Sequence, residues 1–196
     1  MKRIITMVFT VAALFALSAA AQSAAPSFKL MDVDGQPHTL DQYAGKIVVL
    51  EWTNYDCPFV KKFYKTGTMQ ALQKKYTGKD VVWLSVCSSA PGKQGHFSSE
   101  EWKRRMKEDG VKASAVLLDE DGKAGRAYGA SNTPHIFVIN PEGKIIYQGA
   151  IDDKRSADPA TVAGARNYLV EALDALLTGK PVPLSETKAY GCSVKY

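Results

Sequence analysis

Two buried strands joined by a helix constrain the fold more than any other feature of this sequence. Residues 46–52 and 81–86 are runs of mostly β-branched and aromatic side chains, which is typical of strands buried on both faces. Between them, apolar side chains recur at helical spacing from residue 59 to residue 76, with a break expected at 66–68. A strand, a helix and a second strand form a right-handed crossover between parallel neighbours.

The rest of the chain continues the alternation of strands and helices. Ser98 is expected to cap a helix that runs to about residue 109, followed by a strand at 115–119 and a short helix at 123–128. Two antiparallel strands, 135–139 and 144–147, flank the turn at 140–143, and an amphipathic helix is expected over 159–177. The predicted fold class is α/β, with a mixed central sheet and helices on both faces.

The N-terminus has the pattern of an export signal. Lys2 and Arg3 precede an uncharged, mostly apolar run, and small residues follow at 19–21. We expect a signal peptide over 1–21, one domain over 22–178, and an extended tail over 179–196 that carries Cys192. A retained membrane anchor is the alternative. Export would place the protein in the periplasm or otherwise outside the cytoplasm.

Charge excludes one class of partner. The formal net charge is +5, removal of Lys2 and Arg3 lowers it to +3, and the basic residues are scattered among acidic ones. Nucleic-acid binding would favour a basic stripe with interleaved aromatic residues. We therefore expect no nucleic-acid partner, and no membrane association once the signal is removed.

Cys57 is the main candidate for chemistry. It follows the first strand and precedes Pro58, a favoured first residue of a helix. Unpaired N–H groups and the helix dipole stabilise a thiolate there, Lys61 adds a cation, and Asp56 opposes the effect. The position predicts a thiol pKa below the usual value of about 8.5, and hence a nucleophile. A buried, inert cysteine is the structural alternative.

The order of these motifs resembles the thioredoxin superfamily. The matching segments are Asp56-Cys57-Pro58-Phe59-Val60 after a strand with Trp52, Asn132-Thr133-Pro134 before the hairpin, and the ending Gly191-Cys192-Ser193-Val194-Lys195-Tyr196. They are similar to a peroxiredoxin-like redoxin of the AhpC/TSA type. The resemblance implies a thioredoxin-like fold and a cis bond between Thr133 and Pro134 beside Cys57. It also implies that both residues bind the substrate backbone, and that no cofactor is required.

Departures from the family patterns limit what the resemblance implies. Val60 replaces the second cysteine of a Cys-x-x-Cys motif, and Lys61 stands where a copper-carrying relative has its second cysteine, so we expect no metal site. Leu50 and Asn54 replace the Pro and Thr of peroxiredoxins, whose usual Arg is also missing near His135. Disulfide exchange is therefore expected to be faster than reaction with peroxide.

Three cysteines follow the predicted signal, and the partner of Cys57 stays open. Cys192 in the tail, Cys87 at the end of the second strand, and an external thiol are the alternatives. His135 either tunes the thiol or is a hydrogen-bonded structural residue.

Three functions from different classes remain at this point. The first is an exported thiol oxidoreductase that acts on protein or small-molecule thiols and disulfides and is served by an external reductant. The second is a thiol peroxidase that acts on peroxides through the same cysteine. The third is a non-catalytic or metal-handling domain that keeps the fold.

Overall fold

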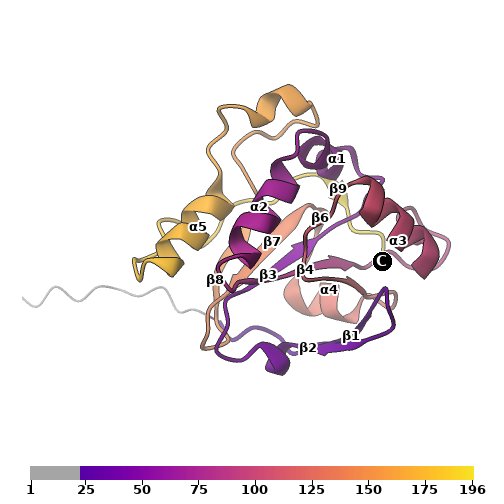
Figure 1. Ribbon diagram of the computed structural model, residues 1–196, viewed down its shortest axis with the longest axis horizontal. Coiled ribbons are helices and arrows are strands. Elements are labelled where there is room, and N and C mark those ends of the chain that lie inside the picture. The colour runs from indigo at the N-terminus through magenta and orange to yellow at the C-terminus, as the bar shows by residue number, and fades with distance from the viewer. Residues whose placement is uncertain (1–22) are drawn as a thin grey trace, which may run out of the picture.

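The computed structural model describes residues 23–196 (Figure 1). The predicted signal peptide and its cleavage site lie outside the described residues. Within 23–196, no helix is both long enough and apolar enough to cross a bilayer.

Across the described residues 23–196, a seven-stranded sheet forms the centre of the molecule, and it is mixed, as the sequence predicts. Its interior strand β3 (Val48–Trp52) is parallel to β4 (Val82–Cys87) and antiparallel to β7 (His135–Ile139). The strand order is β2-β1-β5-β4-β3-β7-β8. The remaining strands are β1 (Lys29–Asp32), β2 (Pro37–Thr39), β5 (Ala115–Leu118) and β8 (Ile145–Gly149).

The sequence did not predict β1 and β2. They are short, half-exposed and polar, and they form an antiparallel pair at the sheet edge. Such segments lack the apolar run that marks a buried strand. The turn η1 (Leu40–Tyr43) follows β2, with Gln42 hydrogen-bonded to the Thr39 backbone N–H in a capping box.

The helices after β3 and β4 begin and end where their sequences predict. Helix α1 (Pro58–Lys65) begins directly after Cys57. The break expected at 66–68 separates it from α2 (Thr68–Thr77) at Gly67, whose φ of +72° suits glycine. Helix α3 (Ser99–Glu108) is capped by Ser98, whose hydroxyl accepts from the Glu101 backbone N–H. The short α4 (Lys123–Tyr128) ends at Gly129.

The helix expected over 159–177 was wrong as a single element. A 3-10 turn η2 (Pro159–Val162) is separated from α5 (Tyr168–Leu177), with Gly164 between them at φ +77°. Asn167 starts a new helix, because its side chain accepts from the Val170 backbone N–H. The apolar positions keep the helical spacing throughout, but Gly164, with its positive φ, and the cap formed by Asn167 divide the segment into η2 and α5.

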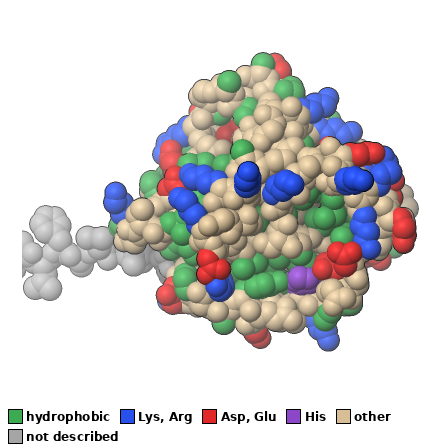
Figure 2. All heavy atoms as spheres, in the orientation of Figure 1, with side chains coloured by type: hydrophobic (Ala, Val, Ile, Leu, Met, Phe, Trp, Pro, Cys, Tyr) green, Lys and Arg blue, Asp and Glu red, His purple; other side chains and the backbone are tan. Residues whose placement is uncertain are grey.

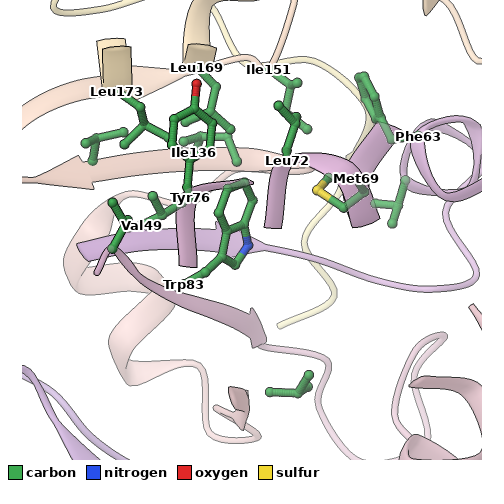
Figure 3. Close-up of a cluster of buried hydrophobic side chains, with 14 of the residues drawn as sticks. Val49, Phe63, Met69, Leu72, Tyr76, Trp83, Ile136, Ile151, Leu169 and Leu173 are labelled. Carbon is green, nitrogen blue, oxygen red and sulfur yellow. The ribbon is translucent and has the colours of Figure 1, made fainter. Parts of the chain in front are cut away.

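The sheet has a hydrophobic core on each face. One face packs against α1, α2, α3 and α5, and Figure 3 shows part of it, in which Tyr76, Trp83, Leu169 and Leu173 are labelled. The other face packs against α4 and the N-terminal segment, around Trp52 and Phe137. On the face seen in Figure 2, Lys and Arg side chains are spread with Asp and Glu among them.

A second, two-stranded sheet lies at one end of the central sheet. β6 (Asn132–Thr133) pairs antiparallel with β9 (Cys192–Ser193), so the C-terminus returns to the segment that precedes β7. Figure 1 shows the yellow C-terminal segment returning to the labels of β6 and β9. This pairing brings Cys192 to the end of the molecule where α1 begins.

Candidate active site at Cys57

Cys57 is the N-cap residue of α1 and is fully buried. Its backbone N–H donates to the Asn54 carbonyl at 2.9 Å, which closes the turn between β3 and the helix. Its own carbonyl accepts from the backbone N–H groups of Val60 and Lys61. The sulfur therefore lies at the positive end of a helix, as the strand, cysteine and proline order predicts.

The sulfur of Cys57 contacts the C-terminal segment and the segment before β7. Its Sγ lies 2.7 Å from Cys192 Sγ, and the thiol donates to the Thr133 carbonyl at 3.1 Å. Both cysteines are free thiols. Burial, followed by the contact with Cys57, raises the pKa of Cys192 to about 12. Cys192 is thus held as a protonated thiol directly beside Cys57.

The backbone of Thr133 contacts Cys57 and pairs with Cys192. The Thr133–Pro134 bond is cis, as expected, and the Thr133 carbonyl lies against the Cys57 sulfur. Across the β6–β9 pair, Thr133 is opposite Cys192, and Asn132 Nδ2 donates to the Gly191 carbonyl at 3.1 Å. The backbone edge expected to bind a substrate is therefore paired with this chain's own tail.

Lys61 has a different partner from the one expected. It is half-exposed, and its Nζ lies 3.9 Å from Asp56 Oδ1, so its charge partly offsets that of the carboxylate. Arg105 of α3 donates to the same Asp56 oxygen at 2.8 Å. The charge of Asp56, which was expected to oppose a thiolate, is compensated mainly by a residue that the sequence did not single out.

Cys87 lies apart from the pair. It is buried at the end of β4, its Sγ donates to the Gly95 carbonyl at 3.5 Å, and burial raises its thiol pKa. Among the described residues, no hydrogen bond joins Cys87 to Cys57 or Cys192. Its strand does end at the same rim, as the parallel crossover predicts, but its sulfur is directed into the 88–97 loop.

His135 is a buried residue of β7. Its Nδ1 accepts from the Ser131 backbone N–H at 3.4 Å, and its ring lies 4.5 Å from that of Phe137. Burial lowers the pKa of His135 to about 4, so the imidazole is neutral at physiological pH. These contacts favour the structural interpretation of this histidine over a catalytic one.

Asn54 stands where peroxiredoxins have their Thr, and its side chain is hydrogen-bonded within the loop around Cys57. Its Nδ2 donates to the Gln94 carbonyl at 3.1 Å, and its Oδ1 accepts from the Asp56 backbone N–H. The amide that replaces the peroxiredoxin Thr is thus engaged in fixing the loop around Cys57.

A buried charged cluster near the tail was missed. Lys62 Nζ lies 3.5 Å from Asp152 Oδ2, and both side chains are almost fully buried. Tyr190 closes the cluster, since its hydroxyl accepts from Lys62 at 2.8 Å and donates to Asp152. Desolvation lowers the pKa of Lys62, and Asp152 opposes this effect. In the sequence, the one signal of this buried cluster was the position of Lys62 beside the apolar positions of α1.

A second missed residue is Glu51, in the middle of β3. Its Oε2 accepts from Trp83 Nε1 at 2.9 Å, Ser85 Oγ at 3.1 Å and Gln73 Nε2 at 3.4 Å. Burial raises the pKa of Glu51 to about 7, against the lowering effect of these donors. A carboxylate inside a strand predicted to be buried on both faces was the available signal.

Comparison with known proteins agrees with this architecture. The model of the AhpC/TSA family matches residues 21–148. The chain belongs to the AhpC/TSA family. This redoxin is 32% identical over 124 residues to the thiol-disulfide oxidoreductase ResA of Bacillus subtilis, a match that covers 63% of this chain and 64% of ResA. The chain therefore matches less than two thirds of that relative's length.

Solved structures extend the likeness of this AhpC/TSA protein over most of the chain. An uncharacterized conserved protein from Geobacillus kaustophilus is 29% identical with a TM-score of 0.78, over 89% of this chain and 91% of that one. The pneumococcal exposed lipoprotein thioredoxin from Streptococcus pneumoniae is 28% identical with a TM-score of 0.50, over 70% of this chain and 97% of that one. The thioredoxin-like fold predicted from the motifs is confirmed.

Proposed function

We propose that this protein is a thiol-disulfide oxidoreductase in which Cys57 attacks the substrate and Cys192 resolves the mixed disulfide. The observation that carries the proposal is the 2.7 Å separation of the two sulfurs at the N-terminus of α1. The likeness to ResA, a thiol-disulfide oxidoreductase, supports the same reaction class. Thr133 supplies the backbone edge that binds substrate.

The reaction proceeds in two exchanges. The Cys57 thiol loses its proton and attacks one sulfur of an external disulfide, whose S–S bond breaks and releases one thiol. Cys192 then loses its proton and attacks Cys57 Sγ, which releases the second thiol and forms the Cys57–Cys192 disulfide. The two protein thiols are oxidised, the external disulfide is reduced to two thiols, and the reverse sequence oxidises a dithiol.

We place this reaction outside the cytoplasm. The basic, apolar and small-residue pattern over 1–21 is that of an export signal. The pneumococcal relative is described as an exposed lipoprotein. Fractionation of cells that produce the full chain tests the location, and a protein found only in the cytoplasm with residues 1–21 attached would contradict it.

Trapping variants test the roles of the three cysteines. Reduced protein is mixed with oxidised glutathione, and adducts are mapped by mass spectrometry. We expect Cys57→Ser to form no active-site adduct and Cys192→Ser to accumulate the Cys57–glutathione mixed disulfide. If Cys87→Ser accumulates that adduct instead, Cys87 is the resolving residue. Turnover that survives Cys57→Ser refutes the proposal.

A thiol peroxidase is the second candidate, because the chain belongs to the AhpC/TSA family. Peroxide would oxidise Cys57 to a sulfenic acid. The Cys192 thiol would then condense with the sulfenic acid to form a disulfide and release water. Cleavage of the O–O bond needs donors directed at the leaving oxygen, and loss of one such donor costs about a hundredfold or more. The peroxiredoxin Thr is replaced by Asn54, one of whose amide hydrogens is donated to the Gln94 carbonyl.

We therefore expect Cys57 to react faster with oxidised glutathione than with hydrogen peroxide at equal concentration. Stopped-flow measurement of both reactions on the reduced protein is the test. A peroxide rate constant near the diffusion limit would make peroxidase the primary function.

A further inference from the structure

The tail that delivers Cys192 also covers the nucleophile. Cys57 is fully buried, its sulfur contacts Cys192, and its thiol proton is donated to the Thr133 carbonyl. The backbone of Thr133 is paired with Cys192 in the β6–β9 ladder. An external disulfide needs both the sulfur and this backbone edge, so it has no place to bind while the tail is seated.

Tyr190 fixes the tail two residues before Cys192. Its ring is buried and lies edge-on to that of Phe59 at 5.9 Å, and its hydroxyl bridges Lys62 and Asp152. A buried ion pair is costly unless further hydrogen bonds satisfy its members. Because Tyr190 supplies one to each partner, departure of the tail would leave the pair incomplete.

Gly191 allows the tail to pack closely against the backbone edge at Thr133. It has a φ of +131°, and a Cβ at this position would lie 2.1 Å from the Thr133 carbonyl oxygen. No side chain other than hydrogen is compatible with the seated tail. Beyond Cys192, the Ala90 backbone N–H donates to the Lys195 carbonyl at 2.8 Å, and Tyr196 donates to the Ala130 carbonyl at 2.6 Å.

We propose that residues 190–194 are an internal occupant of the substrate-docking edge, and that Tyr190, held by Lys62 and Asp152, is the positioning residue that sets how often the edge opens. The inference rests on the proposed thiol-disulfide exchange at Cys57. A substrate reaches Cys57 only when the tail is released, and return of the tail brings Cys192 back for resolution. Tyr190 thereby governs both access and the rate of the second exchange.

Alkylation of Cys57 in the reduced, full-length protein measures opening. A buried thiol reacts with iodoacetamide in proportion to the fraction of molecules that are open. Tyr190→Phe keeps the ring on Phe59 but removes hydrogen bonds to two charged groups, which is expected to raise the open fraction by about tenfold or more. Gly191→Ala prevents close seating and is expected to change the rate in the same direction. Mass spectrometry of the Cys57 peptide gives the rates.

Tyr76→Phe is the matched control. Tyr76 is also a buried tyrosine whose hydroxyl bonds a lysine and an aspartate, Lys75 and Asp174, but its cluster joins α2 to α5. It is expected to leave the alkylation rate of Cys57 unchanged. If this control accelerates the reaction as much as Tyr190→Phe, general loosening explains the effect and the inference is overturned.

A second readout separates positioning from stability. During reaction with oxidised glutathione, the Cys57–glutathione adduct is expected to accumulate transiently in Tyr190→Phe and to remain low in the unmodified protein, because the released tail returns more slowly. Alkylation and adduct levels equal to those of the unmodified protein in both tail variants overturn the inference. The proposed function fails separately, if no Cys57-dependent adduct forms in any variant.

Discussion

Replacement of Glu51 by Gln is expected to change how stability depends on pH. Burial raises the pKa of Glu51 from 4.5 to about 7. Between these values the folded protein keeps a proton on Glu51 that the unfolded chain has released. The contribution of Glu51 to stability is therefore highest below pH 4.5, falls as pH rises, and levels off above about 7. At about 1.4 kcal/mol for each pH unit, this carboxyl costs about 3 kcal/mol at neutral pH.

His135 opposes the pH dependence that Glu51 gives to the stability of the unmodified protein. Burial lowers its pKa from 6.5 to about 4, so the unfolded chain holds the extra proton in that range. Stability from this residue is complete above pH 6.5 and is lost as pH falls toward 4, again by about 3 kcal/mol. The two slopes have opposite signs and overlap between pH 4.5 and 6.5. The pH profile of Glu51→Gln must therefore be compared with that of the unmodified protein.

Urea unfolding of both reduced proteins at pH 4.5 to 8 is the assay. The stability of Glu51→Gln relative to the unmodified protein is expected to rise by about 3 kcal/mol across this range, or about 6–12 °C in Tm for a domain of this size. Changed hydrogen bonds to Trp83 and Ser85 shift this difference by a constant and leave its slope. Glu142→Gln, on an exposed turn, is the control. A stability difference that stays constant with pH refutes the reasoning.

Three further outcomes follow from the same contacts. His135→Gln is expected to lose less stability than the unmodified protein when pH falls from 6.5 to 4.5, which urea unfolding measures, and an unchanged acid slope would contradict the assignment. Arg105→Met leaves Asp56 less compensated at the N-terminus of α1, and is expected to slow alkylation of Cys57 by up to about fivefold; an increased rate would contradict the electrostatic argument. Asn167→Ala removes the cap of α5, and is expected to cost about 1 kcal/mol in urea unfolding, while no change would mean that packing alone holds the helix.

Local signals in the sequence determined much of this protein. The runs at 46–52 and 81–86 predict the central strands, because a strand buried on both faces needs continuous apolar residues. Pro58 and the preceding Cys57 predict the helix start. Thr66, Gly67 and Thr68 predict the break, because they interrupt the apolar spacing. Each prediction depends on residues close together in the chain. The division of the 159–177 helix was missed because the apolar spacing continues across Gly164.

The tertiary structure decided which groups meet at Cys57. Cys192 lies 135 residues away in sequence, and a tail long enough to cross the domain could equally have ended elsewhere. The β6–β9 pair is two residues on each side, too short for any periodic signal. Lys62, Asp152 and Tyr190 come from three separate segments, and apart from the position of Lys62 among the apolar residues of α1, their local sequences do not mark them as buried partners. Only packing removes all three from water together, and that shared desolvation is what makes them an anchor.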